Sequence, residues 1–255
     1  MYRFAAGIVR PILRLAMRRD WRGSEHLPAE GGFIATANHL TNLDALVFAH
    51  YLYDHGAPAR FLAKHTLFSV PGLGWLLRKA GQIPVHRDTT TAGHALEPAR
   101  RLLQEGQTVG IFPEGTFTRD PDLWPMTARL GVARLALSMR VPVIPVAQWG
   151  AQEILPRYGK SVRLLPRRTV RLQAGPPVDL DDLYARATEP AAQREATERI
   201  MAAITTMLAA MRGQQPPDRP YDTRRDGDPR AEELAAKAAR RRARRGRRHQ
   251  GVRDD

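Results

Sequence analysis

The sequence predicts an α/β domain with a mainly parallel central sheet flanked by helices, preceded by an amphipathic N-terminal helical segment. Short apolar runs bounded by glycine and proline alternate with longer segments of helical periodicity. The chain has 255 residues and 43% hydrophobic composition, enough to bury the core of one large domain. In such a fold, functional side chains gather in the loops at the strand ends.

Residues 1–20 predict an interfacial helical segment. Across residues 3–19, apolar and basic side chains fall on opposite sides of a helical wheel. The apolar arc comprises Phe4, Ile8, Val9, Ile12, Leu13 and Leu15, and the basic side comprises Arg3, Arg10, Arg14 and Arg18. Pro11 predicts a kink or a split. The segment is expected to bind an anionic membrane surface, and the alternative is a helix packed on the core.

The strands and helices of the domain are expected in regular alternation. Strands are predicted at residues 31–37, 60–63, 82–86, 108–112, 143–149 and 169–173. Helices are predicted at residues 42–53, 90–104, 128–139 and 190–211. The catalytic domain is therefore expected to span residues 21–212, followed by a basic tail at residues 213–255 that is disordered or conditionally helical.

The formal net charge of +14 and the isoelectric point near 11.1 favour anionic partners. No nucleic acid is expected among them, because no nucleic-acid motif accompanies the charge and aromatic residues are not interleaved with it. The absence of cysteine excludes disulfides, cysteine-ligated zinc and a cysteine nucleophile. No apolar run reaches the ~20 residues that span a bilayer, so we expect a peripheral protein at the cytoplasmic face of the cell membrane.

The most specific motif is Asn38-His39-Leu40-Thr41-Asn42-Leu43-Asp44, in which a strand end delivers a histidine and then an aspartate. The two side chains can meet if His39 stays in the loop and Asp44 begins the next helix. Asp44 would then hold one ring nitrogen as a donor and leave the other as a base toward a substrate hydroxyl. The alternative is a structural Asn-His turn.

A second motif, Phe112-Pro113-Glu114-Gly115-Thr116-Phe117-Thr118-Arg119, follows a buried strand. Gly115 permits close approach of a ligand to its backbone, and Thr116 lies beside it. Arg119 offers a fork of donors for a phosphate. Glu114 either bonds an acceptor hydroxyl or braces the site.

A third motif, Gly81-Gln82-Ile83-Pro84-Val85-His86-Arg87, ends a strand on another arginine. Together with Arg119 and with Lys64 at the end of the preceding strand, Arg87 is expected to form a phosphate pocket. A serine hydrolase is disfavoured because no Gly-x-Ser-x-Gly elbow is present, and no metal is expected because the histidines lack ligand spacing.

These motifs, followed by the run VPVIPV at residues 141–146, resemble the glycerophospholipid acyltransferase family, in particular its lysophosphatidic acid acyltransferase type. The resemblance covers residues 21–149 and implies a catalytic dyad of His39 and Asp44. It also implies phosphate-binding roles for Arg87 and Arg119, and acceptor-site roles for Glu114 and Gly115.

The implied reaction transfers a fatty acyl group from acyl-CoA or acyl carrier protein to a lysophospholipid, converting 1-acyl-sn-glycerol-3-phosphate to phosphatidate, with no cofactor beyond the co-substrate. Phe117 and Thr118 stand where many family members carry Arg-Ser, so glycerol 3-phosphate and other lysophospholipids or glycolipids remain open as acceptors. The alternatives of another class are a basic nucleic-acid-binding protein and a non-catalytic lipid-binding scaffold.

Overall fold

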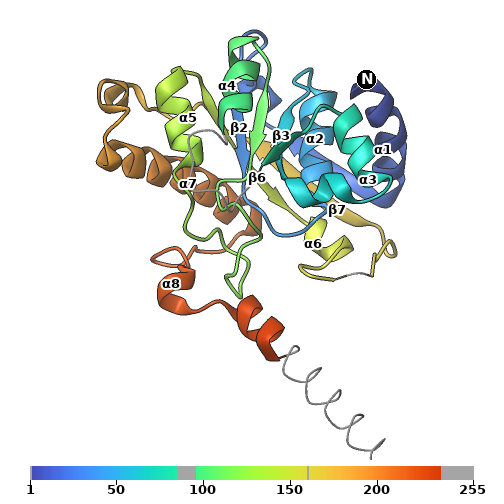
Figure 1. The fold of residues 1–255 in the computed structure, drawn as a ribbon. Helices are drawn as coiled ribbons and strands as arrows, with labels where there is room; N and C mark the ends of the chain where they lie inside the picture. Colours follow the sequence, from blue (N-terminus) through green and yellow to red (C-terminus); the bar gives the residue numbers. More distant parts are fainter. Residues whose placement is uncertain (1, 86–95, 160, 237–255) are drawn as a thin grey trace, which may run out of the picture.

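The fold is one sheet covered by helices on both faces (Figure 1). The computed structural model describes residues 2–85, 96–159 and 161–236. Within these residues the sheet has seven strands in the order β1-β7-β6-β2-β5-β3-β4. The strands are β1 Met17–Arg22, β2 Ile34–Ala37, β3 Arg60–Lys64, β4 Ile83–Val85, β5 Val109–Ile111, β6 Val143–Trp149 and β7 Arg168–Ala174. All neighbouring pairs are parallel except β6 and β7, which confirms the predicted α/β class.

The central strands β2 and β6 are apolar along nearly their whole length because helices cover both faces of the sheet. All four residues of β2 are buried, and only Trp149 of β6 is partly exposed. The two strands pair in parallel register from Ile34 opposite Val143 to Ala37 opposite Val146. β2 therefore ends at the middle of the sheet, directly before Asn38 and His39.

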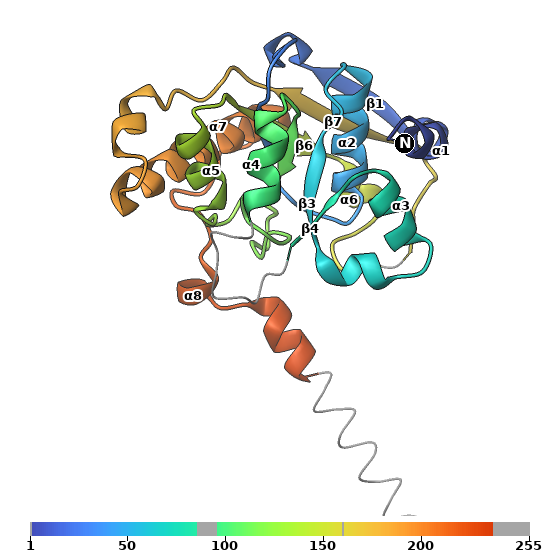
Figure 2. The ribbon, with the colours of Figure 1, turned by 45° about the horizontal axis from the view of Figure 1, so that its top comes forward.

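The helices divide between two hydrophobic cores, one on each face of the sheet (Figure 2). Their bounds are α1 Tyr2–Ala16, α2 Asp44–Asp54, α3 Leu73–Lys79, α4 Glu97–Gln104, α5 Gly131–Met139, α6 Ala151–Ile154 and α7 Pro190–Arg212, with 3-10 helices at Ser24–His26, His65–Ser69 and Asp181–Arg186. α1, α2 and α6 pack with Ala35 and Ile144, whereas α4, α5 and α7 pack with Ile34 and Val143. Adjacent strand residues point to opposite faces, which explains the division.

The structure corrects the prediction of a helix over residues 3–19. α1 runs as one helix through Pro11 and ends at Ala16, and the next six residues form the edge strand β1. β1 pairs in parallel with β7, from Met17 opposite Arg168 to Arg22 opposite Gln173. This pairing with a distant strand outweighs the local helical periodicity of the arginine-rich segment. α3 was also not predicted from the sequence.

α1 has one side that packs on the core and another apolar side that is exposed. Leu13 is buried in the core, and Val9 packs against it. Ile8, Ile12 and Leu15 are 46%, 61% and 78% exposed. The helix is therefore packed on the core along one side, whereas another side is apolar and exposed; membrane binding of α1 stays a prediction.

The arginines of α1 do not simply face solvent. Arg10 and Arg14 form ion pairs with Asp54 at the end of α2. Arg19 of β1 also pairs with Asp54, with its Nη1 atom 3.2 Å from Oδ2.

No helix within the described residues combines the length and apolar character needed to cross a bilayer.

The described part of the C-terminal segment, residues 213–236, packs against the domain. Gly213 ends α7 in the left-handed conformation with φ 62°. Tyr221 then forms a bridge with Met126 and accepts a 2.9 Å hydrogen bond from the Thr127 amide. The short helix α8 spans Thr223–Asp226, and residues 229–236 are also helical. Residues 237–255 of the predicted tail lie outside the described residues.

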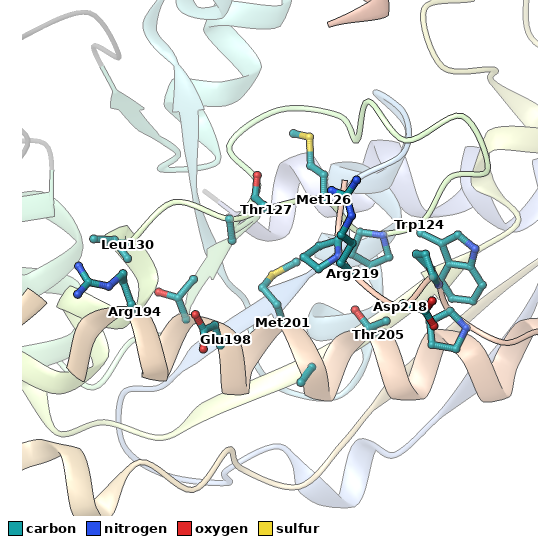
Figure 3. Close-up of a pocket in the computed structure, with 17 residues that line it drawn as sticks. Trp124, Met126, Thr127, Leu130, Arg194, Glu198, Met201, Thr205, Asp218 and Arg219 are labelled. Atoms are coloured by element: carbon teal, nitrogen blue, oxygen red, sulfur yellow. The ribbon is translucent and has the colours of Figure 1, made fainter. Parts of the chain in front are cut away.

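A pocket of about 390 Å³ lies where this segment crosses α7 (Figure 3). Its walls are residues 124–128 and Leu130, the α7 side chains around Met201, and residues 216–220. The figure shows Arg194 and Glu198 on α7 at one end of this pocket and Trp124 at the other. The pocket is separate from the cavity that His39 lines.

Candidate functional site

The loop after β2 is held rigidly by a pair of buried amide side chains. The side-chain amide of Asn38 donates a 3.0 Å hydrogen bond to the backbone oxygen of Gln148. The side-chain oxygen of Asn38 accepts a 2.9 Å hydrogen bond from the backbone N–H of Gln148. The Gln148 side chain donates in turn to the backbone oxygen of Asn38 at 2.6 Å. The bonds tie the end of β2 to the end of β6 and set the direction in which His39 leaves the sheet. Sequence analysis did not single out Gln148.

His39 and Asp44 lie together as the motif predicted. The Nδ1 atom of His39 is 3.1 Å from Oδ2 of Asp44, the first residue of α2. The same oxygen accepts hydrogen bonds from the backbone amides of Leu40 and Thr41, at 2.5 and 2.8 Å. Because the fully buried carboxylate is held in place and can only accept when ionised, Nδ1 of a neutral His39 carries the proton. The Nε2 atom is then the free base.

Two phenylalanines from the second motif enclose the His39 ring. Phe112 stacks on it, with ring centroids 4.0 Å apart and an angle of 12° between the planes. Phe117 meets it edge-on at 4.5 Å and 74°. The two aromatic side chains fix the ring plane and leave the His39 side chain only 14% exposed. Phe117, which departs from the commonest family pattern, is therefore a direct neighbour of the histidine.

Glu114 is a buried brace that joins the loop after β2 to the connection between β5 and α5. Its Oε1 accepts the backbone amide of His39 at 3.0 Å, and its Oε2 accepts that of Met126 at 3.1 Å. Burial raises the pKa of Glu114 to about 8, although the hydrogen bonds from Met126 and His39 oppose this rise. Only 2% of the residue is exposed, so the geometry favours the bracing role over contact with an acceptor hydroxyl.

His39 lines a cavity of about 420 Å³. Lys64, Gly115 and Thr116 line the same cavity, so the structure brings these predicted site residues together with the histidine. Gly115 has a φ of 72°, and a side chain there would meet Arg129, whose Nε lies 2.9 Å from the position of an added Cβ. Because the Arg129 side chain is exposed and can move, it is the left-handed backbone conformation that favours glycine at this wall of the cavity.

A narrower apolar cavity of about 180 Å³ adjoins the His39 cavity between α1, α2 and α3. The two cavities share Ala45, Phe61, Ala63 and Leu67 as lining residues. The lining of the narrower cavity is almost entirely apolar. An extended hydrocarbon chain fits this chemistry.

Arg119 lies in the loop beyond Glu114 and lines a neighbouring cavity rather than the His39 cavity. Its Nε is 3.0 Å from Oδ1 of Asp228 in the C-terminal segment. Its guanidinium also donates to the Tyr158 hydroxyl at 2.5 Å and to the Phe117 backbone oxygen at 3.2 Å. Sequence analysis identified neither Asp228 nor Tyr158. Arg87, the other predicted phosphate ligand, lies outside the described residues.

Comparisons with known proteins identify the family to which the chain is similar. A family model described as Acyltransferase matches residues 18–149. A 1-acyl-sn-glycerol-3-phosphate acyltransferase from Borreliella burgdorferi is 34% identical over 125 residues, which are 49% of this chain and 48% of that protein. The chain thus spans about half the length of this relative. A protein of the same name from Bacillus subtilis is 29% identical over 182 residues, 71% of this chain and 84% of that protein.

Among solved structures, the fold resembles the crystal structure of the 1-acyl-sn-glycerophosphate acyltransferase PlsC from Thermotoga maritima. The TM-score is 0.66, at 22% identity over 85% of this chain and 81% of that chain. This likeness supports the fold. Because the family model extends from β1 to the end of β6 and includes both His39 and Asp44, the chain belongs to the acyltransferase family.

Proposed function

We propose that the protein is an O-acyltransferase that transfers a fatty acyl group from acyl-CoA or acyl carrier protein to the hydroxyl of a lysophospholipid. The acceptor we favour is 1-acyl-sn-glycerol-3-phosphate, which gives phosphatidate, since the relatives from Borreliella and Bacillus carry this name. The carrying observation is the 3.1 Å contact of His39 with the buried Asp44, at a cavity that adjoins an apolar cavity.

The reaction follows from the protonation state of His39. Its neutral Nε2 takes the proton of the acceptor hydroxyl while the hydroxyl oxygen attacks the thioester carbonyl carbon. Asp44 stabilises the imidazolium that forms. When the tetrahedral intermediate collapses, the carbon–sulfur bond breaks and the imidazolium returns its proton to the leaving thiolate. General-base catalysis contributes about 10²- to 10⁴-fold, and the remaining acceleration comes from positioning and oxyanion stabilisation.

Different groups of surrounding residues bind the fatty acyl chain and the acceptor phosphate. The adjoining apolar cavity takes the fatty acyl chain, whose burial is favourable by about 0.8 kcal/mol per methylene. Arg119, Arg87 and Lys64 attract the acceptor phosphate, and Gly115 and Thr116 border the reacting groups. Glu114 acts through His39, because its carboxylate holds the histidine backbone rather than a substrate.

We further propose that the protein binds peripherally to the anionic cytoplasmic face of the cell membrane, where its acceptor resides. The exposed Ile8, Ile12 and Leu15 on α1 support this proposal, together with exposed apolar residues near α3. The latter are Leu67, Val70, Leu73 and Trp75. α1 and α3 are in contact and lie side by side in Figure 2, so the segments that carry these apolar side chains are neighbours.

A panel of acceptors tests the proposed function. Purified protein is incubated with labelled palmitoyl-CoA and with lysophosphatidate, glycerol 3-phosphate or other lysophospholipids, and products are identified by mass. We expect the greatest transfer to lysophosphatidate and a rate at least about 10²-fold lower with the His39→Ala variant. Absence of acyl transfer to every acceptor, with both acyl-CoA and acyl carrier protein as donor, would contradict the proposal.

A further inference from the structure

A larger cavity adjoins the His39 cavity at Gly115. Its volume is about 980 Å³, and Gly115, Thr116 and Arg129 line both it and the His39 cavity. Four arginines line it, namely Arg119, Arg129, Arg194 and Arg224. They come from the loop after Glu114, the residues before α5, α7 and α8 respectively. We call this space the arginine cavity.

The four arginines of the arginine cavity outnumber the carboxyl groups that line it, which are those of Glu114, Asp222 and Asp228. Arg119 is paired with Asp228, and the Asp222 side chain accepts the backbone amide of Arg224. Among the described residues, no carboxylate lies within the 4.0 Å ion-pair distance of the guanidinium groups of Arg129, Arg194 or Arg224. These three side chains are exposed to the cavity and therefore accessible to a ligand. A bound anion would relieve their mutual repulsion and accept their hydrogen bonds.

The arginine cavity also borders the pocket in Figure 3. Both are lined by Met126, Leu130 and Arg194, and Figure 3 shows Arg194 at one end of that pocket. The Figure 3 pocket adds a mostly apolar wall around Met201. A ligand that reaches from His39 into the arginine cavity thus finds cationic donors first and an apolar pocket beyond them.

We propose that the arginine cavity binds a phosphate-bearing group of one substrate through Arg194 and Arg224, in addition to the contact already assigned to Arg119. This inference rests on the proposed acyl transfer, because it assigns the group to a substrate of that reaction. A planar guanidinium group can bind two oxygens of one phosphate. Arg194 and Arg224 each offer such a group to the cavity. Two sources carry the required chemistry: the phosphorylated adenosine portion of acyl-CoA, and the polar head of a phospholipid acceptor.

Binding is measured without turnover. Isothermal titration calorimetry of the full chain uses adenosine 3′,5′-bisphosphate and, separately, glycerol 3-phosphate as probes. We expect the double variant Arg194→Gln with Arg224→Gln to weaken binding of one probe by about tenfold or more. Arg101→Gln on α4 is the matched control, since it removes one arginine charge from an exposed site away from the cavity. His39→Ala should leave probe binding unchanged.

Steady-state kinetics of the same variants identify the source. If the cavity holds the coenzyme, the double variant raises the KM for acyl-CoA and leaves the acceptor KM unchanged. If it holds the acceptor head, the acceptor KM rises and the acyl-CoA KM stays constant. In both cases the Arg101→Gln variant retains the kinetic constants of the wild-type protein.

The failure of this inference differs from the failure of the proposed function. Unchanged probe binding and unchanged KM values in the double variant, with acyl transfer intact, would overturn the inference and leave the function standing. A second outcome would overturn the proposed function and keep the anion site. In that case the wild-type protein transfers no acyl group to any acceptor, but it binds the probe more tightly than the double variant does.

Discussion

The buried carboxylate of Glu114 accepts a 3.0 Å hydrogen bond from the backbone amide of His39. The Thr118 backbone amide donates a hydrogen bond to the His39 backbone oxygen at 2.8 Å. Both the backbone N–H and the backbone C=O of His39 are therefore held. The two motifs are therefore one structural unit, although 75 positions separate Glu114 from His39. The orientation of the proposed base depends on a residue that need not touch the substrate.

Replacing Glu114 with Gln should lower both activity and stability. The amide can accept from only one of the two backbone N–H groups that the carboxylate now holds, so the other loses its partner. A buried donor without a partner costs about 1–3 kcal/mol. We expect this decrease in the free energy of urea unfolding and a fall in kcat, with a smaller change in either KM. Wild-type kcat in the variant would contradict the bracing role.

The pH dependence of stability should change in the same variant. Burial raises the pKa of Glu114 to about 8 from an ordinary value of 4.5, so the folded chain holds this proton more tightly than the unfolded chain. Its stabilising contribution is fully present below pH 4.5 and is lost as the pH rises through about 8. Between about pH 4.5 and about pH 8, the wild-type free energy of unfolding should fall more steeply than that of Glu114→Gln. Equal slopes would show that Glu114 does not titrate in this range.

Substitutions at Arg119 and at Asp228 should change the acceptor KM in opposite directions. Arg119→Ala should raise the acceptor KM by about 10- to 100-fold and the donor KM far less, since its charged hydrogen bonds are assigned to the acceptor phosphate. Asp228→Asn frees the guanidinium and should lower the acceptor KM by about two- to fivefold, the worth of a partly exposed ion pair.

Asp226→Asn is the control for this pair, because Asp226 lies in the same segment but pairs with Arg219 and Arg225. It should leave the acceptor KM unchanged. A rise in the acceptor KM with Asp228→Asn would mean that Asp228 positions Arg119 for the phosphate instead of competing with it.

The exposed apolar side of α1 predicts membrane binding that point substitutions can test. Deleting residues 1–19 would also remove half of β1, so the triple replacement of Ile8, Ile12 and Leu15 by Ser is the cleaner change. We expect weaker co-sedimentation with liposomes containing phosphatidylglycerol and an unchanged Tm. High salt should reduce, but not abolish, the binding of the wild-type chain.

Leu234→Ser removes a similarly exposed apolar side chain, at 50% exposure, from the C-terminal segment and serves as the control. Undiminished co-sedimentation of the triple variant would show that α1 does not dock on the membrane.

The sheet centre was predictable because burial on both faces leaves a clear apolar run. β6 and the start of α7 fall at the predicted residues. β1 was not predictable, since its arginines continue the helical pattern of α1 and only pairing with β7 makes it a strand. Such pairing is a long-range contact that local periodicity does not contain.

The site divides in the same way. His39 and Asp44 were found from local spacing, because a loop and the first turn of a helix suffice to join them. The bracing geometry of Glu114 and the contact of Arg119 with Asp228 arise between segments far apart in the chain. Neither pattern has a local signature in the sequence.

The most direct test of the central claim is the rate of acyl transfer by His39→Ala and Asp44→Asn. Each should lower kcat by about 10²-fold or more, because the first removes the base and the second removes the charge that orients and stabilises it. Circular dichroism and Tm should confirm that both variants are folded. A folded His39→Ala protein that retains more than about a tenth of the wild-type rate would contradict a mechanism in which His39 is the general base.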